Sequence, residues 1–567
     1  MPKQQLLEVR VRRLLKKGIR HHRAGRRGPA EACYHRILKA DSRCSRALHL
    51  LGLLAQQAGQ YEESLQLMGE ALALNPDDPD TLNSLAESYL GLGKIEQAIP
   101  HYRRALELQP DSADANCKLA HVLRLRGDLA EALRLSEYAV ALNPRRFETF
   151  NELGLVLTDM ENPGAAAEAF QRAVALNPDS ALTALSLSYF YVKSGDIPAA
   201  ADALRRAIKL DPKAHLSHVS LGAVLCMLGD WAGALECYER ARALCPNSPD
   251  VSYYLGLLHL SLGNFALGWR EHEEREGARR MRKKFSQPQW KGEPLQGARI
   301  LLHAEQGLGD TLHFVRYVPL VAARGGQVVL AVQARLHRLL AGTEGAWQVI
   351  LSDGGTVSDF HWHCPLLSLP LAFGTELSTI PDKIPYVYPD PPLVKAWEQR
   401  MQGNSLRVGL AWGGNPNYPH EFWRSILLEQ LAPLTNLENT TFYSLQMGAP
   451  AEQVKQLGPR VHLIDLQNEQ ADFADTAAIV ANLGLVISID TSVAHLAGAM
   501  GKPVWILLHK SPDWRWLLEG EDSPWYPTAR LFRQSTLGNW QDVVARVEGE
   551  LRELVARTAV GTRNRGP

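Results

Sequence analysis

Small and apolar residues recur at fixed positions, every 34 residues, through the first half of the chain. Six prolines keep this spacing: Pro76, Pro110, Pro144, Pro178, Pro212 and Pro246. An alanine lies five residues before each proline: Ala71, Ala105, Ala139, Ala173, Ala207 and Ala241. A second small residue lies twelve residues before each: Ser64, Ala98, Ala132, Ala166, Ala200 and Ala234. Glycine marks the middle of five repeats and glutamate that of the other: Gly59, Gly93, Gly127, Glu161, Gly195 and Gly229. The pattern predicts two amphipathic helices per repeat, which turn at the glycine, cross closely at the small residues and end before the proline.

This period resembles that of tetratricopeptide repeats, and the resemblance covers about residues 11–280. The first copy has Ser42 in place of the proline, and the last helical pair, which begins near Asp250 and turns at Gly263, lacks a closing proline. Both ends therefore resemble the capping repeats of a solenoid. The resemblance implies a concave groove that binds a protein or peptide; a scaffold or dimerisation arm is the alternative.

The hydrophobic pattern changes after the basic stretch 279–284. Short apolar runs that are typical of buried strands replace the 34-residue period, at 298–303, 327–332, 407–412, 440–446, 461–466, 483–490 and 502–508. Helical patterns lie between some of them, for example at 311–326 and 475–482. Strands that alternate with helices predict parallel α/β sheets.

We therefore expect a multidomain chain in which an all-α repeat solenoid precedes a pair of α/β lobes. The predicted parts are a basic N-terminus with a degenerate capping repeat (1–42), the solenoid (43–285), a first, acceptor-side α/β lobe (286–391), a second, donor-binding α/β lobe (404–557) and a tail (558–567).

The composition is that of an ordinary globular protein, with 46% hydrophobic and 22% charged residues. Lys plus Arg and Asp plus Glu both number 61, and this balance argues against a dedicated nucleic-acid-binding protein. No apolar run is long enough for a transmembrane helix, and the N-terminus lacks the apolar core of a signal peptide. The seven cysteines show no C-x-x-C pair, so we expect reduced thiols and a cytoplasmic protein. The basic run from Arg10 to Arg27 is interpreted as a solvated helix face or as a contact for acidic lipid or an acidic partner, which would place the protein at the inner membrane surface.

The first candidate site follows the strand at 298–303. Gly307 and Gly309 allow the backbone to turn tightly, which leaves Asp310 at the start of the next helix. In parallel sheets, ligands bind at the carboxyl ends of the strands. A carboxylate in this place acts as a general base, or it merely caps the helix.

The second candidate site follows the strand at 483–490, where Thr491 and Ser492 begin a helix. The backbone N–H groups and the dipole of such a helix suit a diphosphate. His495, one turn further on, donates to a phosphate oxygen or a sugar hydroxyl, or it is a packed core histidine. Arg424 follows the glycine-rich loop that opens at Gly413, and it either neutralises a phosphate or is an ordinary surface arginine.

Two blocks of sequence resemble the heptosyltransferase-like glycosyltransferases. SIDTSVAHLAGAMGKPVWIL (488–507) is similar to their donor-site signature, and EQGLGDT (305–311) is similar to their N-terminal glycine–aspartate loop. With the repeats and PDWRWLL (512–518), nearly the whole chain resembles bacterial proteins that join such repeats to a glycosyltransferase. The resemblance implies a GT-B fold of two Rossmann-like lobes and an inverting transfer that needs neither a metal nor a cofactor.

The same resemblance implies roles for individual residues. Asp310 would be the catalytic base that deprotonates the acceptor hydroxyl, and Gly307 and Gly309 would shape the loop backbone beside it. The residues that would bind the donor are Gly413, Arg424, Thr491, Ser492 and His495. A base on the acceptor side and positive charge at the departing diphosphate are what direct displacement at an anomeric carbon requires.

We therefore expect a glycosyltransferase that moves a sugar from a nucleotide sugar to a protein or other bulky acceptor recruited by the repeats. Two alternatives stay open. One is an interaction scaffold with a degenerate transferase-like domain, which the aromatic stretch 415–424 favours. The other is a sugar transferase for a glycolipid or lipopolysaccharide at the inner membrane surface. We expect no nucleic-acid partner.

Two weaker signals complete the sequence analysis. The segment His361–Cys364 contains metal-ligand side chains, but alternate residues in a short strand more often pack or face solvent, so no metal is expected. Trp514, Trp516, Trp525 and Tyr526 could stack on a nucleotide, but core packing between the lobes is the favoured interpretation.

Overall fold

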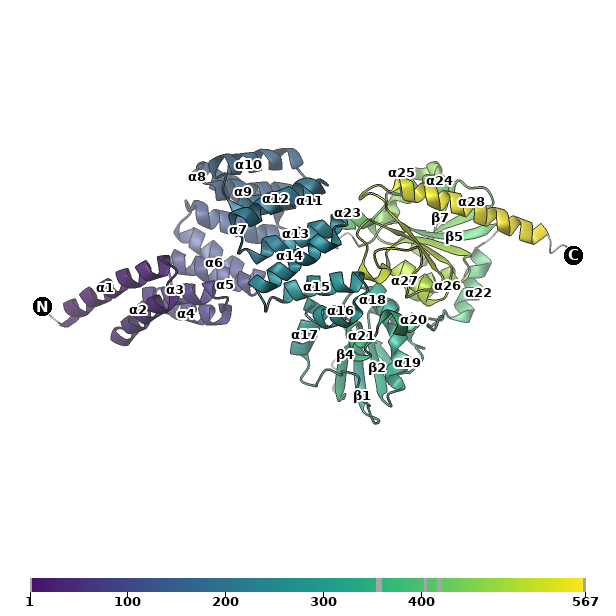
Figure 1. The fold of residues 1–567 in the computed structure, drawn as a ribbon, viewed down its shortest axis with the longest axis horizontal. Helices are drawn as coiled ribbons and strands as arrows, with labels where there is room; N and C mark the ends of the chain where they lie inside the picture. The colour runs from purple at the N-terminus through teal and green to yellow at the C-terminus, as the bar shows by residue number, and fades with distance from the viewer. Residues whose placement is uncertain (1–2, 353–358, 402–404, 416–420, 564–567) are drawn as a thin grey trace. The chain divides into compact units, whose positions relative to one another are not determined.

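The computed structural model describes residues 3–352, 359–401, 405–415 and 421–563. The chain forms two compact units, Met1–Lys213 and Ala214–Pro567. Figure 1 shows that the first unit contains helices, whereas the second combines helices with two β-sheets. The structure confirms the predicted order of a repeat solenoid followed by parallel sheets. The assignment of the sheets to the GT-B fold, and the domain boundaries drawn from the sequence, stay predictions.

The first unit is built from helices that pack in consecutive pairs. Its helices are α1 (Lys3–Arg23), α2 (Arg27–Ala40), α3 (Ser45–Gln57), α4 (Tyr61–Leu74), α5 (Pro79–Gly91), α6 (Ile95–Leu108), α7 (Ala113–Arg126), α8 (Leu129–Leu142), α9 (Phe147–Asp159), α10 (Pro163–Leu176), α11 (Ala181–Lys193) and α12 (Ile197–Leu210). The second helix of each proline-marked repeat ends two residues before the proline, because proline has no N–H group to continue the helix.

The small residues of the 34-residue pattern lie where the two helices of a repeat cross. Eleven of the twelve are fully buried and the other, Ala71, is 2% exposed. Each turn between paired helices is closed by a residue in the left-handed region, which glycine adopts without strain. Glu161, which replaces glycine in one repeat, keeps the same backbone conformation, with φ of 57°. The repeat geometry is therefore retained even where the sequence departs from the pattern.

The basic N-terminal run lies on α1 and the following turn. Its arginine and lysine side chains at Arg10, Arg12, Arg13, Lys16 and Lys17 are exposed to solvent. This exposure fits both interpretations of the run, a solvated helix face and a contact for acidic lipid or an acidic partner.

The second unit begins with the last repeat helices. These are α13 (His215–Leu228), α14 (Trp231–Leu244), α15 (Pro249–Ser261), α16 (Phe265–His272) and α17 (Glu276–Lys284). They pack into the α/β part: the Trp269 indole N–H donates to the carbonyl oxygen of Thr375 at 2.9 Å, and Phe265 stacks on Trp525 with ring centroids 6.1 Å apart. The last repeat is therefore part of the same hydrophobic core as the sheets.

Two parallel sheets follow, and seven of their ten described strands coincide with the predicted apolar runs. The smaller sheet has the order β3-β2-β1-β4, with β1 (Arg299–His303), β2 (Gln327–Val332), β3 (Ala346–Leu351) and β4 (Trp362–Pro365). The larger sheet has the order β10-β9-β8-β5-β6-β7, with β5 (Leu406–Ala411), β6 (Thr440–Ser444), β7 (Leu463–Asp465), β8 (Leu485–Ile489), β9 (Val504–Leu508) and β10 (Ala529–Arg533). All its strand pairs are parallel. Numbered from β5, this is the 3-2-1-4-5-6 order of doubly wound nucleotide-binding sheets.

Helices connect the strands of both sheets. Those of the smaller sheet and the linking segment are α18 (Leu308–Phe314), α19 (Val318–Ala322), α20 (Ala334–Leu340), α21 (Leu369–Ala372) and α22 (Pro391–Arg400). Those of the larger sheet are α23 (Glu421–Arg424), α24 (Leu428–Thr435), α25 (Glu452–Leu457), α26 (Phe473–Ala481), α27 (Ser492–Ala499) and α28 (Gln541–Arg563). A 3₁₀ turn, Trp514–Trp516, lies between β9 and β10.

Aromatic side chains fill the core where the two sheets and the last repeat meet. Trp514 is 3% exposed, and Trp516, Trp525 and Tyr526 are fully buried. Trp514 meets Trp269 edge to face with centroids 5.1 Å apart, a favoured geometry for aromatic pairs. The predicted core packing of these residues is confirmed.

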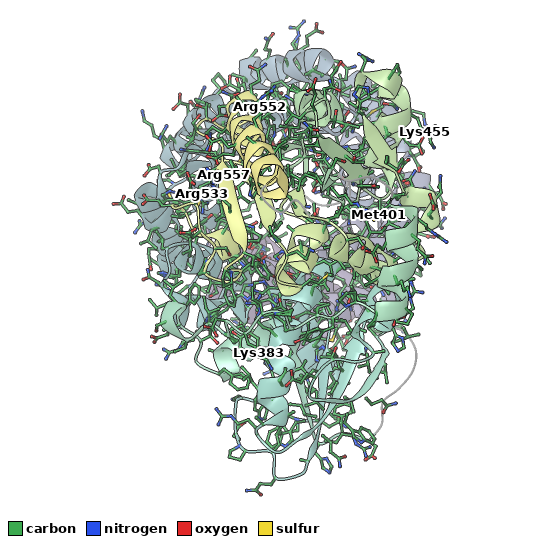
Figure 2. All side chains as sticks on the ribbon, turned by 90° about the vertical axis from the view of Figure 1, so that its right-hand side faces the viewer. Lys383, Met401, Lys455, Arg533, Arg552 and Arg557 are labelled. Atoms are coloured by element: carbon green, nitrogen blue, oxygen red, sulfur yellow. The ribbon has the colours of Figure 1, made fainter. Side chains whose placement is uncertain are left out.

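The C-terminal helix is longer than the sequence analysis predicts. α28 continues through Arg563, into the segment 558–567 that was predicted to be a tail, and residues 564–567 lie outside the described residues. Figure 2 shows Arg552 and Arg557 on this helix, where their side chains are 63% and 77% exposed.

Candidate functional site

The candidate site lies at the carboxyl ends of β5 and β8, where the strand order of the larger sheet reverses. β5 leads into Gly413, and β8 leads into Asp490 and Thr491. Ligands of doubly wound sheets bind at this switch point because the loops diverge there and leave a crevice. Gly413 and Thr491, two of the predicted donor residues, are thus brought to neighbouring strand ends.

The two sequence motifs that were predicted to act together do meet in the structure. α18, which carries Asp310, packs against α27, which begins at Ser492. A Cβ atom on Gly309 would lie 2.8 Å from Cδ2 of His495 and 3.5 Å from Cα of Ser492. A side chain at position 309 would therefore collide with α27. Glycine at this position lets the two helices approach each other.

Each carboxylate oxygen of Asp310 accepts a hydrogen bond from a different partner. The Gly307 N–H donates to Oδ2 at 2.9 Å, and the guanidinium of Arg515 donates to Oδ1 in a short ion pair. The first bond shows that Asp310 caps α18, which was one of its two predicted roles. Burial raises the pKa of Asp310 above its ordinary value, although the charge of Arg515 opposes this rise. A base role toward an acceptor hydroxyl stays a prediction.

Arg515 lies at this site, although the sequence analysis assigns it no role. It lies in the turn Trp514–Trp516, its side chain is 8% exposed, and its guanidinium lies 4.4 Å from the centre of the Trp514 ring. Besides Asp310 it pairs with Asp513, with Nη1 2.8 Å from Oδ1. Its sequence context, PDWRWLL, was noted only for its resemblance. One buried cation is thus shared between two carboxylates from different parts of the chain.

Asp490 adds a third carboxylate at the end of β8. Burial, reinforced by the negative charge of Asp513, raises its pKa to about 6, while Arg424 and Arg515 oppose the rise. A carboxyl group whose pKa is higher in the folded protein than in the unfolded chain binds its proton more tightly when folded. Its contribution to stability is therefore present at low pH and is lost as the pH rises through about 6.

We accordingly expect Asp490→Asn to stabilise the second unit at pH 7.5, by on the order of 2 kcal/mol, because the amide removes the buried charge. The gain should shrink toward pH 4, where the wild-type carboxyl group is protonated. Urea unfolding followed by tryptophan fluorescence measures this, since all 13 tryptophans lie at or after Trp231. A gain that is the same at both pH values would show that Asp490 does not titrate as described.

His495 is a packed and neutral imidazole, as the second of its two interpretations predicts. It is 5% exposed and stacks on Trp516 with centroids 5.4 Å apart. Burial, reinforced by the neighbouring Arg515, lowers its pKa well below the ordinary value. His495 therefore brings no positive charge to a phosphate. The hydrogen bond from His495 to the nucleotide sugar stays a prediction, and a neutral imidazole has one N–H group with which to make it.

The Tyr526 hydroxyl links two buried histidines. Its Oη lies 2.9 Å from Nδ1 of His495 and 2.8 Å from Nδ1 of His313. Among the described residues, Nε2 of His313 has no hydrogen-bond partner. The hydroxyl therefore connects a ring of α18 to a ring of α27.

Thr491 serves as the N-cap of α27. Its Oγ1 accepts from the Val493 N–H at 3.3 Å and hydrogen bonds to Oγ of Ser488 at 3.0 Å. Ser and Thr side chains in this place satisfy one of the free N–H groups at a helix start. The role of Thr491 in the structure is thus to hold the first turn of α27, and the predicted contact of Thr491 and Ser492 with a phosphate stays a prediction.

The glycine-rich loop after β5 is occupied by side chains of the protein itself. The Gly413 N–H donates to Oε1 of Gln446 at 2.7 Å. The carboxylate of Glu421 accepts from the Gly414 N–H at 2.7 Å, from Ser425 Oγ at 2.5 Å and from Arg424 Nη2 at 2.5 Å. Arg424 is therefore partnered by an acid rather than being an ordinary surface arginine. Residues 416–420 of the predicted loop 415–424 lie outside the described residues.

The set of donors around Glu421 defines a position for an anion. A backbone N–H, a hydroxyl and a guanidinium converge on one carboxylate, and such donors also bind phosphate oxygens. In the structure the Glu421 carboxylate holds these donors, and a phosphate in its place stays a prediction. This arrangement was not visible in the sequence, because it depends on how the loop folds back on itself.

Two further expectations concern metals and membranes. In the part of the chain that the structure describes, no three His, Cys, Asp or Glu side chains group together as a metal site would require. His361, His363 and Cys364 are included in that statement, and the Cys364 thiol is fully buried. Across the same residues, no helix is both long and apolar enough to cross a membrane.

Comparison with known proteins identifies the repeats. The tetratricopeptide repeat family matches residues 43–111, 83–146 and 151–215, and a TPR repeat matches residues 222–263. Protein FlbA of Caulobacter vibrioides is 29% identical over 326 residues, which cover 52% of this chain and 54% of FlbA. The chain thus spans about half the length of this curated relative.

Several solved structures are similar to the repeat part. A tetratricopeptide repeat protein from Parabacteroides merdae is 15% identical, with 44% of this chain and 98% of that chain covered at a TM-score of 0.39. A thermophilic TPR protein of Thermus thermophilus is 24% identical, with 32% of this chain and 99% of that chain covered at a TM-score of 0.30. The family matches show that the repeats of this chain are tetratricopeptide repeats.

Proposed function

We propose that the chain is a glycosyltransferase that takes a sugar from a nucleotide sugar and transfers it to a protein or peptide acceptor. The observation that carries the proposal is the meeting of α18 and α27 beside the switch point of the larger sheet. A carboxylate, Asp310, then lies next to the start of α27 and pairs with Arg515, and Arg424 lies close enough to the neighbouring Asp490 to lower its pKa. The tetratricopeptide repeats indicate a protein-interaction role, which supports a protein acceptor.

In this proposal each side of the site does one part of the reaction. The donor diphosphate binds the N–H groups at the start of α27 and the donors of the Gly413–Gly414 loop, where Arg424 balances its charge. Asp310 accepts the proton of the acceptor hydroxyl as the oxygen attacks the anomeric carbon and the nucleoside diphosphate leaves. General base catalysis of this kind contributes about 10²–10⁴-fold in rate. Burial raises the pKa of Asp310, which makes its carboxylate a stronger base.

A second function is favoured by one observation. Because the Glu421 carboxylate already holds the donors of the glycine-rich loop, the larger sheet could lack room for a diphosphate. The chain would then be an interaction scaffold that retains the transferase-like fold. The two functions differ in whether a nucleotide diphosphate displaces Glu421.

Calorimetric titration with a panel of nucleoside diphosphates and nucleotide sugars distinguishes the two functions. We expect one nucleotide class to bind, Arg424→Gln to weaken that binding about tenfold, and Glu421→Gln to strengthen it about tenfold. The amide of Glu421→Gln keeps the shape of the side chain but no longer competes as an anion. Lys455→Gln, which removes an exposed charge of the same unit, is the control.

The outcomes are separable. No binding to the wild type or to folded Glu421→Gln would contradict a nucleotide-sugar transferase and leave the scaffold. Opposite shifts in the two loop variants, with Lys455→Gln unchanged, would locate the diphosphate at the Glu421 position.

A further inference from the structure

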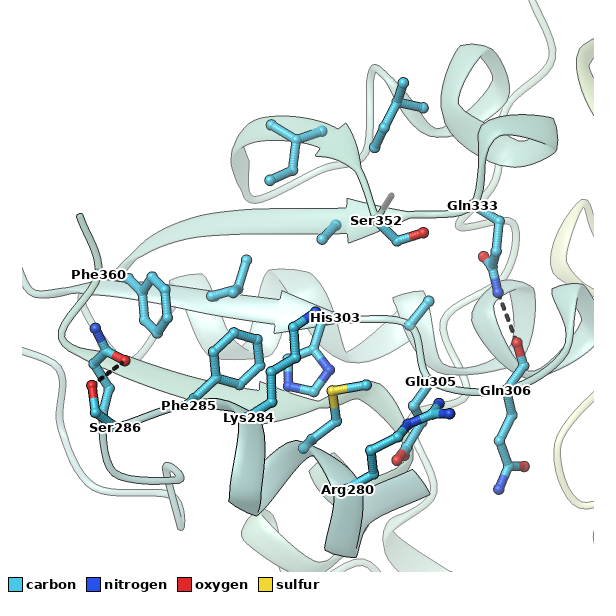
Figure 3. A pocket seen from close by; sticks show the side chains of 17 residues that line it. Arg280, Lys284, Phe285, Ser286, His303, Glu305, Gln306, Gln333, Ser352 and Phe360 are labelled. Atoms are coloured by element: carbon cyan, nitrogen blue, oxygen red, sulfur yellow. Dashed lines mark hydrogen bonds between the residues drawn. The ribbon is translucent and has the colours of Figure 1, made fainter. Parts of the chain in front are cut away.

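A cavity of about 880 Å³ lies in the second unit, apart from the residues placed at the donor site. One side of it is a face of the smaller sheet, and α17, which carries Arg280 and Lys284, forms a wall next to the sheet, as Figure 3 shows. Phe285 and Phe360, with ring centroids 5.5 Å apart, line one end. Its polar end lies past the carboxyl ends of the strands, where ligands of parallel sheets bind. The cavity is large enough for a few residues of a peptide or a ligand of similar size.

The wall contributed by α17 carries two positively charged side chains. Arg280 and Lys284 are four residues apart on this helix and therefore share a face. Among the described residues neither has an acidic partner, whereas the neighbouring Arg282 pairs with glutamates. Of the lining carboxylate, Glu305, Oε1 is bound by Arg275, with Nη2 at 2.5 Å, and Oε2 has no partner among the described residues. The two cations of α17 therefore favour an anion at their end of the cavity.

The lining also contains polar groups that carry no charge. His303 is 4% exposed, and its Nδ1 has no partner while its Nε2 lies 3.3 Å from Nδ1 of His363. Burial lowers the pKa of His303 to about 3, so the ring is neutral. Its Nδ1 can donate to or accept from an uncharged group of a ligand, depending on the tautomer. Uncharged amides and hydroxyls follow along the rim: Ser286, Gln287, Gln306, Gln333 and Ser352. An amide side chain both donates and accepts, as the backbone of a peptide does.

The rim of the cavity is tied to the loop that carries Asp310. Gln333 Nε2 donates to the carbonyl oxygen of Gln306 at 2.9 Å, which Figure 3 marks, and Thr311 Oγ1 donates to Gln333 Oε1 at 2.9 Å. Gln306 precedes the Gly307–Asp310 turn, and Thr311 follows Asp310. A ligand that fills the cavity and extends over this rim therefore approaches Asp310 from the acceptor side.

We propose that this cavity binds an acidic peptide segment that contains an aromatic or apolar residue, and that this segment is the acceptor. Arg280 and Lys284 bind its carboxylates, Phe285 and Phe360 pack against its apolar side chain, and the amide side chains of Gln287 and Gln306 bond to its backbone. An acyl chain offers these two amides no hydrogen-bonding group, which favours a peptide over a lipid. The role of this segment as acceptor rests on the proposed transferase function, whereas its binding to the cavity does not.

The test is calorimetric titration of the full chain, without nucleotide, with an acetylated and amidated peptide of sequence Glu-Phe-Glu-Ser-Gly. A matched peptide, Gln-Phe-Gln-Ser-Gly, lacks the charges. We expect the acidic peptide to bind about tenfold more tightly than the neutral one, and Arg280→Gln/Lys284→Gln to remove this preference. The control is Lys283→Gln/Lys291→Gln, which removes the same charge from two lysines that do not line the cavity.

Each outcome bears on the proposal. Equal binding of the two peptides, or equal losses in the two double variants, would overturn it. So would binding of phosphatidylglycerol vesicles that depends on Arg280 and Lys284 when the peptide does not bind. Because no nucleotide is present, failure here with nucleotide binding intact removes the peptide site and leaves the proposed transferase standing.

Discussion

Replacing Asp310 by asparagine is expected to lower the rate of sugar transfer by about 10²–10⁴-fold, the contribution usual for a general base. Asparagine has the same shape and can still accept the Gly307 N–H, which donates at 2.9 Å, so α18 keeps its cap. It cannot take a proton from an acceptor hydroxyl. Nucleotide affinity, measured by calorimetry, should change by less than about tenfold, since the donor groups belong to the other side of the site.

The matched control is Asp513→Asn. Asp513 and Asp310 are the two carboxylates that pair with Arg515, but Asp513 lies in the segment before the Trp514–Trp516 turn and not on α18. If Asp310 is the base, transfer by Asp513→Asn should stay within a few fold of the wild type. Equal losses in the two variants would instead mean that both carboxylates act by positioning Arg515, and Asp310 would lose its role as base.

The repeats could be predicted closely because their constraints are local in sequence. A proline ends a helix by its own chemistry, and small residues at fixed offsets mark the crossing of two adjacent helices. Strands that are continuous apolar runs could be predicted for a similar reason, since β2 coincides with the run 327–332. β3 and β10 were missed, because β3 is only partly buried and β10 carries an arginine at positions 530 and 533. The length of α28 was misjudged because nothing in TAVGTR, apart from one glycine, ends a helix.

The candidate site could be predicted only in part. The strand–helix turns at Asp310 and Thr491 follow from glycines and polar residues after apolar runs, and the structure does place the two helices together. The partners of these residues could not be predicted, because they come from distant parts of the chain. Arg515 lies 205 positions from Asp310, and no periodicity links them. The Glu421 carboxylate at the Gly414 N–H depends in the same way on a loop conformation that local sequence does not fix.

Replacing Arg515 by methionine should destabilise the second unit by about 3–5 kcal/mol, as expected when one partner of a buried ion pair is removed. The Arg515 side chain is 8% exposed, and it pairs with Asp310 and Asp513 while its charge also opposes the raised pKa of Asp490. Methionine fills similar volume but leaves these carboxylates without their cation. Urea unfolding followed by tryptophan fluorescence measures the loss in this unit, and Arg552→Met, at an exposed ion pair of α28, should cost less than about 1 kcal/mol.

The pH dependence of this loss separates charge from packing. Arg515 opposes the rise in the pKa values that burial imposes on Asp310 and Asp490, so without it both groups bind protons more tightly in the folded state. The destabilisation by Arg515→Met should therefore be largest near pH 7.5 and become smaller as the pH falls and the carboxylates are protonated. Adding Asp310→Asn to Arg515→Met should recover part of the loss at pH 7.5, because one buried charge is removed with its partner. A loss that is independent of pH and is not recovered in the double variant would show that Arg515 stabilises the site through packing on Trp514 alone.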